Sequence, residues 1–412
     1  MTDTVVDGAL DGLKVIDMTA MLAGPYASMM LADQGASVIK VEPPGGDNTR
    51  RVGPHLEGAL AQGDGGFGGY FASINRNKRS IVIDLKSEDG LAVLRDLVRS
   101  ADVLLENYRL GVMDRLGLGY EKLREINPRL VYASVRGFGD PRGGESPYAN
   151  WPAYDPVAQS MGGIMAITGP VPGGNPTKIG PGVGDIIPAM FSAFGIVSAC
   201  WRAQRTGQGQ YVDVAMVDSI LAICERIIFQ YSGTGQVPGV SGNGHPLLCP
   251  FGLFQAKDGW ISLAIPKDHF WDHFVKLIGR PELATDPRFL TNEIRLSNND
   301  ETVAVVTEWT SARTRAEIAE VLGGEVPFGP VYRADDIFAD PHFAVRKMLE
   351  QVEQPGAADK LTIAGTPVRM TETPGGVRHR APLTGEHTDE ILSEFGFDAE
   401  RIEHLRASGA VA

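Results

Sequence analysis

The most constraining feature of the sequence is an alternation of strand-like and helix-like segments that begins near the N-terminus. Residues 13–18 (LKVIDM) predict a buried strand, residues 24–34 (GPYASMMLADQ) a helix with proline in its first turn, and residues 36–42 (ASVIKVE) a second strand. A strand–helix–strand unit places its two strands in parallel. The same alternation recurs through residues 80–135. The sequence therefore predicts an α/β fold with a large Rossmann-like parallel sheet.

The pattern changes after about residue 233. A loop rich in glycine and proline leads into strands over residues 251–264, and charged helices follow over residues 269–322. Residues 330 onward return to strands separated by proline and glycine, and a helix is expected over residues 388–394. We therefore expect the middle of the chain to form a second, smaller α+β domain.

Charge and cysteine content narrow the class of protein. The net charge of −13 argues against nucleic acid as a partner, because phosphate binding needs a basic surface. The three cysteines are far apart, which indicates a reducing compartment and no disulfide framework. The N-terminus has no apolar signal segment, and no run reaches the ~18 apolar residues that span a membrane. We expect a cytoplasmic protein without a membrane partner.

Three patterns suggest sites that we do not favour. The first strand-to-helix turn has Gly24 alone, whereas a dinucleotide-binding turn needs several glycines. A literal G-x-G-x-x-G at Gly63, Gly65 and Gly68 has no strand before it and is interpreted as a loop. His269 and His273 share a helix face, but Phe270 stands where a zinc helix has glutamate, so no metal site is expected.

Asp185 stands at the end of GPGVGD, directly before a long apolar helix. One interpretation is a simple capping residue, because free N–H groups and the helix dipole stabilise a carboxylate there. The other is a nucleophile, since flanking glycines allow a substrate to approach and the same N–H groups can stabilise a developing oxyanion. The segment alone leaves both open.

Basic and amide side chains stand beside the predicted strands, at residues 75–79, 107–109, Arg115 and Arg136. Loops at the carboxyl ends of parallel strands form the ligand crevice of such sheets. Arginine and lysine there suit phosphates, although a solvated rim of surface ion pairs has the same composition. Residues 241–246 (SGNGHP) form either a turn or a lid over a reactive intermediate.

Taken together, the motifs and their order along the chain form a recognisable pattern. The chain resembles the class III CoA-transferase (CaiB/BaiF) family from about residue 10 to residue 405. The resemblance is carried by LDGLKVIDMT, AGPYASMMLADQGASVIKVEPPGGD, NRNKRSIVIDL, LLENYRLGVMDRLGLGYEKLREINPRLVYASVRGFG, GVGD, TGQGQYVDVAM, VPFGPV and APLTGEHTDEIL. It implies a large domain built from both chain ends, with a smaller middle domain, in an interlocked homodimer. The boundaries we predict are 1–220, 221–329 and 330–412.

The resemblance also implies a mechanism in which Asp185 becomes acylated and then carries CoA as a thioester. Its substrates are CoA thioesters and small carboxylates, with no permanently bound cofactor and no metal. The glycine-rich lid over the intermediate corresponds to Gly242, Asn243 and Gly244. The implied CoA contacts are Leu22, Ala23, Ile74, Asn75, Lys78, Arg79, Asn107, Tyr108, Arg109, Arg115, Arg136 and Phe138.

Departures from the family pattern bear on the substrate. Formyl-CoA transferase-like members have glutamine where this chain has Leu22, and a longer glycine loop, which disfavours a formyl or oxalyl substrate. The related α-methylacyl-CoA racemases need a histidine before an aspartate, and here Tyr154 precedes Asp155. We expect a transferase, with a short dicarboxylate such as succinate or mesaconate favoured. A racemase-like isomerase and a non-catalytic acyl-CoA-binding protein are the alternatives.

Overall fold

The computed structural model describes residues 8–60 and 66–412. Gly63 and Gly65 of the G-x-G-x-x-G match lie outside these residues. The described chain divides into two compact units. The first comprises residues up to 163, residues 180–225 and residues 341–412, and the second comprises residues 164–179 and 226–340. The first unit thus contains both ends of the chain.

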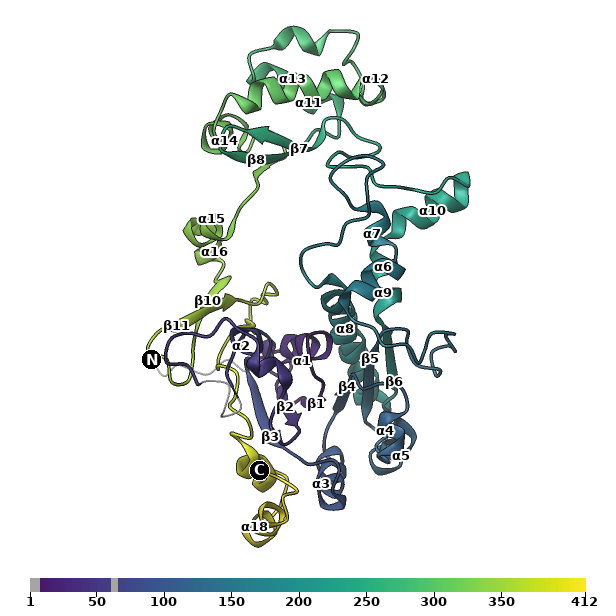
Figure 1. Cartoon of the computed structure of the whole chain (residues 1–412), viewed down its shortest axis with the longest axis vertical. Coiled ribbons are helices and arrows are strands. Elements are labelled where there is room, and N and C mark those ends of the chain that lie inside the picture. The colour runs from purple at the N-terminus through teal and green to yellow at the C-terminus, as the bar shows by residue number, and fades with distance from the viewer. Residues whose placement is uncertain (1–7, 61–65) are drawn as a thin grey trace. The chain divides into compact units, whose positions relative to one another are not determined.

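Within the described residues, the first unit is built on a six-stranded sheet in the order β3-β2-β1-β4-β5-β6 (Figure 1). Its strands are β1 (Lys14–Met18), β2 (Ser37–Glu42), β3 (Lys78–Val82), β4 (Val103–Glu106), β5 (Val131–Arg136) and β6 (Tyr211–Ala215). All neighbouring strands are parallel, as predicted. The strand order reverses between β1 and β4, which pair with Ile16 opposite Leu104, and such a switch point opens a crevice at the carboxyl ends of the strands.

The sheet is covered by helices that the apolar pattern largely predicted. The predicted helix over residues 24–34 is α1 (Ala23–Asp33), and the predicted helix over residues 388–394 is α17 (Thr388–Glu394). The remaining elements of the first unit are η1 (Asn48–Arg51), α2 (Gly69–Ile74), α3 (Glu88–Val98), α4 (Val112–Arg115), α5 (Tyr120–Ile126), α6 (Asp155–Met161), α8 (Val183–Thr206), α9 (Met216–Ile223), α16 (Pro341–Val345), β10 (Leu349–Glu353), β11 (Lys360–Ala364) and α18 (Ala399–Ala407).

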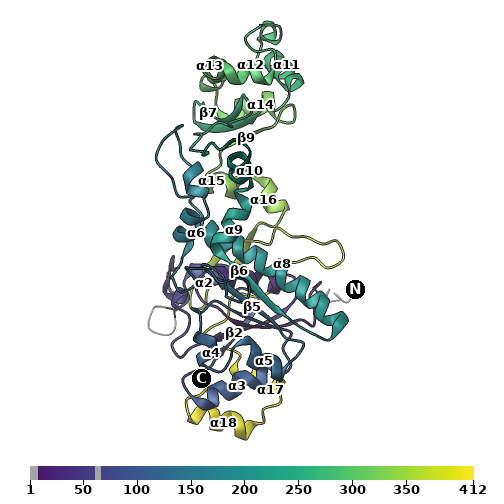
Figure 2. The same ribbon diagram turned by 90° about the vertical axis from the view of Figure 1, so that its right-hand side faces the viewer.

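The long helix α8 is the element that carries Asp185 (Figure 2). By length and composition it could cross a membrane, with a mean hydropathy of 1.7 in its most apolar window, but core helices of globular proteins meet the same criterion. It packs against α1, β5 and α9, and its buried face includes Ala189, Ile196 and Ala203. Its apolar character is therefore that of a helix packed on the sheet.

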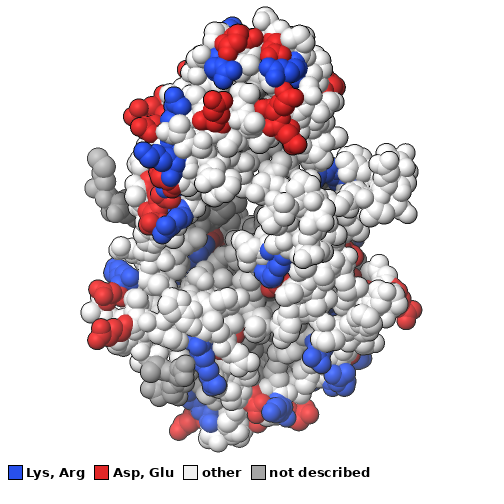
Figure 3. All heavy atoms as spheres, turned by 45° about the horizontal axis from the view of Figure 1, so that its top comes forward, with Lys and Arg blue, Asp and Glu red and all other residues white. Residues whose placement is uncertain are grey.

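In the described part of the second unit, three antiparallel strands pack against helices. The strands are β7 (Phe251–Ala256), β8 (Gly259–Ala264) and β9 (Phe328–Pro330). The other elements are α7 (Ile164–Ile167), α10 (Glu225–Thr234), α11 (Asp268–Leu277), η2 (Pro281–Ala284), α12 (Asn292–Ser297), α13 (Asn299–Ser311), α14 (Arg315–Leu322) and α15 (Ala334–Ala339). Trp271, Phe274 and Phe289 are fully buried in its core. On the face shown in Figure 3, acidic and basic side chains are interspersed.

Candidate active site

A cavity of about 590 Å³ opens in the first unit at the carboxyl ends of the parallel strands. Met18, Glu42 and Arg136 line it from the last positions of β1, β2 and β5. Asp185 contributes to the same wall. The predicted site residues that line this cavity together are Ala23, Asn107, Tyr108, Arg109, Arg115, Arg136 and Asp185. The cavity therefore lies where the strand order predicted a crevice.

Asp185 is the third residue of α8, and Gly182 is the residue at the N-cap. A carboxylate in the first turn of a helix is stabilised by the helix dipole. The backbone N–H of Gly184 donates to Oδ1 of Asp155 at 2.9 Å, so Asp155 takes the capping role. A Cβ on Gly184 would lie 2.5 Å from the backbone oxygen of Asp155, and one on Gly182 would lie 3.0 Å from Cδ2 of Leu22. Gly184 is therefore required by close packing against the backbone of α6, and Gly182 makes a tight contact with a leucine side chain.

The turn between β1 and α1 approaches Asp185 and is tied to the loop after β4. The Asn107 amide donates to the Ala20 carbonyl at 2.7 Å and accepts from the Ala20 N–H at 3.0 Å. The next residue, Met21, has a left-handed φ of 69° and lines the cavity. A left-handed conformation costs a residue with a side chain on the order of 1–3 kcal/mol. The Asn107 amide supplies two of the hydrogen bonds that hold this strained turn.

The predicted residues at positions 74–79 lie before or at the start of β3, at the amino end of a parallel strand, whereas the cavity lies at the carboxyl ends. Asn75 is buried, and its Nδ2 donates to the Phe71 carbonyl. Arg79 bonds Glu390 and Glu394. Ile74, Asn75, Lys78 and Arg79 are absent from the lining of this cavity. Their contact with CoA stays a prediction.

The remaining predicted site residues are Phe138, a predicted CoA contact, and Gly242, Asn243 and Gly244, the predicted lid. Phe138 is buried and packs against Tyr148 and Trp151, with ring centroids 5.6 and 6.2 Å away, and Trp151 lines the cavity. Gly242, Asn243 and Gly244 lie in the second unit, where the Asn243 carbonyl accepts from the N–H of Leu253 in β7. The lid role of these three residues also stays a prediction.

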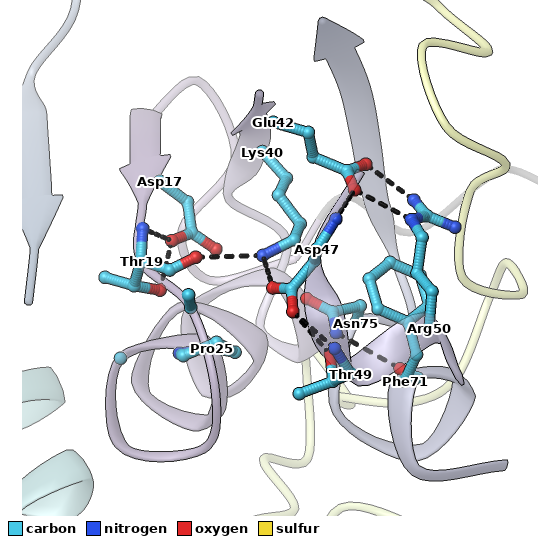
Figure 4. A network of polar contacts seen from close by, with 12 residues as sticks. Asp17, Thr19, Pro25, Lys40, Glu42, Asp47, Thr49, Arg50, Phe71 and Asn75 are labelled. Carbon is cyan, nitrogen blue, oxygen red and sulfur yellow. Dashed lines mark hydrogen bonds and ion pairs between the residues drawn. The ribbon is translucent and has the colours of Figure 1, made fainter. Parts of the chain in front are cut away.

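A buried network of charges lies behind one wall of the cavity (Figure 4). The Lys40 ammonium donates to the Thr19 carbonyl at 3.0 Å and lies 2.9 Å from Oδ2 of Asp47. Asp17 accepts from Thr19 and pairs with Lys78 at 3.0 Å. Burial favours protonation of Asp17, but Lys78 and Lys40 outweigh it and hold the pKa of that carboxyl below its usual range. The network fixes Thr19 and Asp47, which both line the cavity.

Sequence reasoning missed Lys40 and Asp47 as cavity residues. Their signal was present, because Lys40 and Glu42 are charged residues inside an otherwise apolar strand, SVIKVE. Burial lowers the pKa of Lys78 to about 8, although Asp17 opposes that shift. Among residues 8–60 and 66–412, no three His, Cys, Asp or Glu side chains lie together as a metal site requires. His273 instead pairs with Glu325 at 2.8 Å.

Comparison with known proteins yields matches over nearly the whole chain. The family model for CoA-transferase family III matches residues 10–388. The chain is 47% identical over 394 residues to the succinyl-CoA:mesaconate CoA-transferase of Haloarcula marismortui, covering 95% of this chain and 97% of that relative. It is 41% identical to the acetyl-CoA:oxalate CoA-transferase of Acetobacter aceti, covering 94% and 96%. The crystal structure of a CaiB/BaiF family protein from Brucella suis superposes with a TM-score of 0.82 at 37% identity, covering 94% and 100%.

Proposed function

The chain belongs to CoA-transferase family III, and we propose that it transfers CoA from an acyl-CoA donor to a short dicarboxylate through acylation of Asp185. The observation that carries the proposal is the place of Asp185, in the first turn of α8 and in the wall of the cavity at the sheet's switch point. Close relatives are named CoA-transferases that use CoA thioesters and dicarboxylates.

In the proposed reaction, Asp185 attacks the thioester carbonyl of the donor and breaks its C–S bond. This step forms a mixed anhydride and releases CoA as a thiolate. The thiolate attacks the aspartyl carbonyl, which releases the donor acid and leaves Asp185 bound to CoA as a thioester. The acceptor carboxylate then attacks this thioester, and the returning thiolate forms the new acyl-CoA and regenerates Asp185. Attack by the acceptor forms a second mixed anhydride, and both anhydrides hydrolyse unless water is excluded.

The first turn of α8 can assist these steps. Its dipole favours negative charge at the helix start, where oxyanions develop on the aspartyl carbonyl. Gly184 lets α6 pack against this turn, which holds Asp185 in the cavity wall. We assign the loop of Gly242, Asn243 and Gly244 to covering the intermediate, as the resemblance implies.

We propose mesaconate and succinate as the pair of acids, with CoA entering beside Asn107, Tyr108 and Arg109. The name of the Haloarcula relative supports this pair, and oxalate belongs in the test panel because of the Acetobacter relative. A homodimer agrees with exposed Phe191, Phe194 and Trp201 on α8, since large exposed apolar side chains mark interfaces. A cytoplasmic location agrees with the three cysteines, which form no disulfide within the described residues.

The test is to incubate the protein with each acyl-CoA donor and a panel of acids, and to follow products and intact protein by mass spectrometry. We expect new acyl-CoA esters with dicarboxylates, and a protein adduct of CoA minus water that hydroxylamine releases. Asp185→Asn and Asp185→Ala should lose the adduct and reduce turnover on the order of 10³-fold or more. Full activity in Asp185→Ala would refute the mechanism.

The same panel separates the two alternative functions. A racemase-like isomerase would exchange deuterium from solvent into the acyl α-carbon without any acceptor acid. A non-catalytic binding protein would bind CoA equally with Asp185→Asn and would transfer CoA to none of the acids tested.

A further inference from the structure

The peptide group of Tyr108 is held from both sides in the wall of the cavity. Its N–H donates to Oε2 of Glu106 at 2.8 Å, and its carbonyl accepts from Nε of Arg136 at 3.1 Å. The ring of contacts closes because Nη2 of Arg136 also donates to Oε1 of Glu106. Glu106 ends β4 and Arg136 ends the neighbouring strand β5, so the sheet itself sets the spacing of the two side chains.

The remaining donors of Arg136 are directed to other protein groups. Nη1 donates to Asp140 and, at 3.0 Å, to the hydroxyl of Tyr211, which donates in turn to Ser134 at 2.7 Å. The Arg136 side chain is 8% exposed, and those of Glu106 and Asp140 are fully buried. Four of the five N–H donors of this guanidinium, at Nε, Nη1 and Nη2, thus have protein acceptors and fix the cavity wall.

The charges around Arg136 also argue that it does not bind a phosphate. Two buried carboxylates, Glu106 and Asp140, face the single positive charge of Arg136. Arg142 also pairs with Asp140, but it is neutralised in turn by Glu121. Phosphate binding by arginine relies on a free, net positive group. An incoming phosphate would meet a neutral to negative cluster at Arg136.

We propose that Glu106 and Arg136 are positioning residues that clamp the Tyr108 peptide group, and that Arg136 acts on CoA through this clamp rather than as a phosphate ligand. The proposal rests on the CoA-transferase function above. The clamp also acts beyond Tyr108, because it fixes its neighbours Asn107 and Arg109, which line the cavity as well. Through the Asn107 amide it reaches Ala20 and the strained turn before α1.

The test compares Glu106→Gln, Arg136→Lys and the double variant with the native enzyme. Lysine keeps the charge but cannot bond Tyr108, Glu106 and Asp140 in the fork geometry of arginine. Calorimetry measures the Kd of the free enzyme for CoA and for dephospho-CoA, and steady-state kinetics give kcat and KM. Thermal unfolding monitors the fold of each variant.

Each single variant should weaken CoA binding about 10- to 100-fold, the range expected for hydrogen bonds to charged groups. The binding of dephospho-CoA, which lacks the 3′-phosphate, should weaken by the same factor, because no contact to that phosphate is lost. KM should rise with kcat within about threefold of native, as for a loss of uniform binding. The double variant should bind CoA about as well as either single variant, because both remove one coupled unit.

Tyr211→Phe removes one acceptor from Arg136 and provides a milder variant if Arg136→Lys does not fold. This variant should weaken the binding of CoA and of dephospho-CoA equally, by about 2- to 10-fold. Arg380→Lys is the matched control, because Arg380 also joins a carboxylate, Glu386, to a backbone carbonyl, that of Ala381, away from this cavity. It should keep the native Kd for CoA.

Two outcomes would overturn the proposal. If Arg136→Lys weakens the binding of CoA but not of dephospho-CoA, while Glu106→Gln binds both as the native enzyme does, Arg136 contacts the 3′-phosphate directly. If the variants lower the unfolding temperature and leave every Kd unchanged, the pair serves stability alone. The Kd measurements use CoA without a donor or acceptor, so a failure of the Asp185 mechanism would leave them unaffected.

Discussion

The carboxylate of Asp155, at the start of α6, accepts a hydrogen bond from the backbone N–H of Gly184, the residue directly before Asp185. Two acidic side chains thus meet at one helix start with different geometry. Asp155 is buried and caps α8, whereas Asp185 faces the cavity. Replacing Asp155 by Ala should lower the free energy of unfolding by about 1 kcal/mol, because the cap is lost. Asp155→Asn keeps an acceptor oxygen and should stay near native; equal losses for both variants in urea unfolding would contradict this.

The close contact at Gly184 gives a second prediction. A Cβ there would overlap the backbone oxygen of Asp155, so Gly184→Ala should displace the first turn of α8. We expect a loss of about 1–3 kcal/mol in stability and a drop in turnover, since Asp185 moves with that turn. Gly180→Ala is the matched control, because nothing lies within 4 Å of its Cβ position. A fully active Gly184→Ala would show that the approach of α6 is not critical.

Lys40 gives a prediction on stability. Replacing it by Met leaves the buried Asp47 carboxylate without this cation and the Thr19 carbonyl without this donor. Breaking a buried pair from one side costs about 3–5 kcal/mol. Arg380→Gln breaks the partly exposed pair with Glu386 and should cost about 1 kcal/mol or less. Chemical denaturation measures both, and similar small losses would mean that the network of Figure 4 adds little.

The affinity for acyl-CoA should depend on pH through Glu106. Burial raises the pKa of Glu106 to about 7, against the opposite effects of Arg136 and the Tyr108 N–H, while Asp140 and Asp114 add to the rise. As the pH falls through about 7, Glu106 takes up a proton and loses the charge that holds Arg136 and Tyr108. KM for acyl-CoA should therefore rise on the acid side of pH 7. Glu106→Gln should remove this inflection, and its persistence would assign the inflection to another group.

The fold was predictable because its signal is local. Segments such as LKVIDM and ASVIKVE are apolar enough to be buried on both faces of a sheet, and they became β1 and β2. The place of Asp185 at a helix start followed in the same way from the glycines before a long apolar run. Each of these features depends only on about twenty consecutive residues.

The contacts of the charged residues were less predictable, because they depend on strand direction and on distant partners. Arg79 is the second residue of β3, at the amino end of the strand, and its partners Glu390 and Glu394 are more than 300 positions away. Arg136 stands at the last position of its strand and does line the cavity, yet its donors are taken by Glu106, Tyr108 and Asp140. The position of a basic residue at a strand end predicts where its side chain lies. Whether that side chain is available for a ligand depends on the protein groups that it already contacts.

The amide of Asn107 joins two loops that leave the sheet on opposite sides of the switch point, one after β1 and one after β4. Such a cross-tie makes the lengths of the two loops interdependent, because an insertion in either would pull Ala20 and Asn107 out of register. We therefore expect changes in length to be tolerated better in wall segments outside these two loops, such as the one around Trp151.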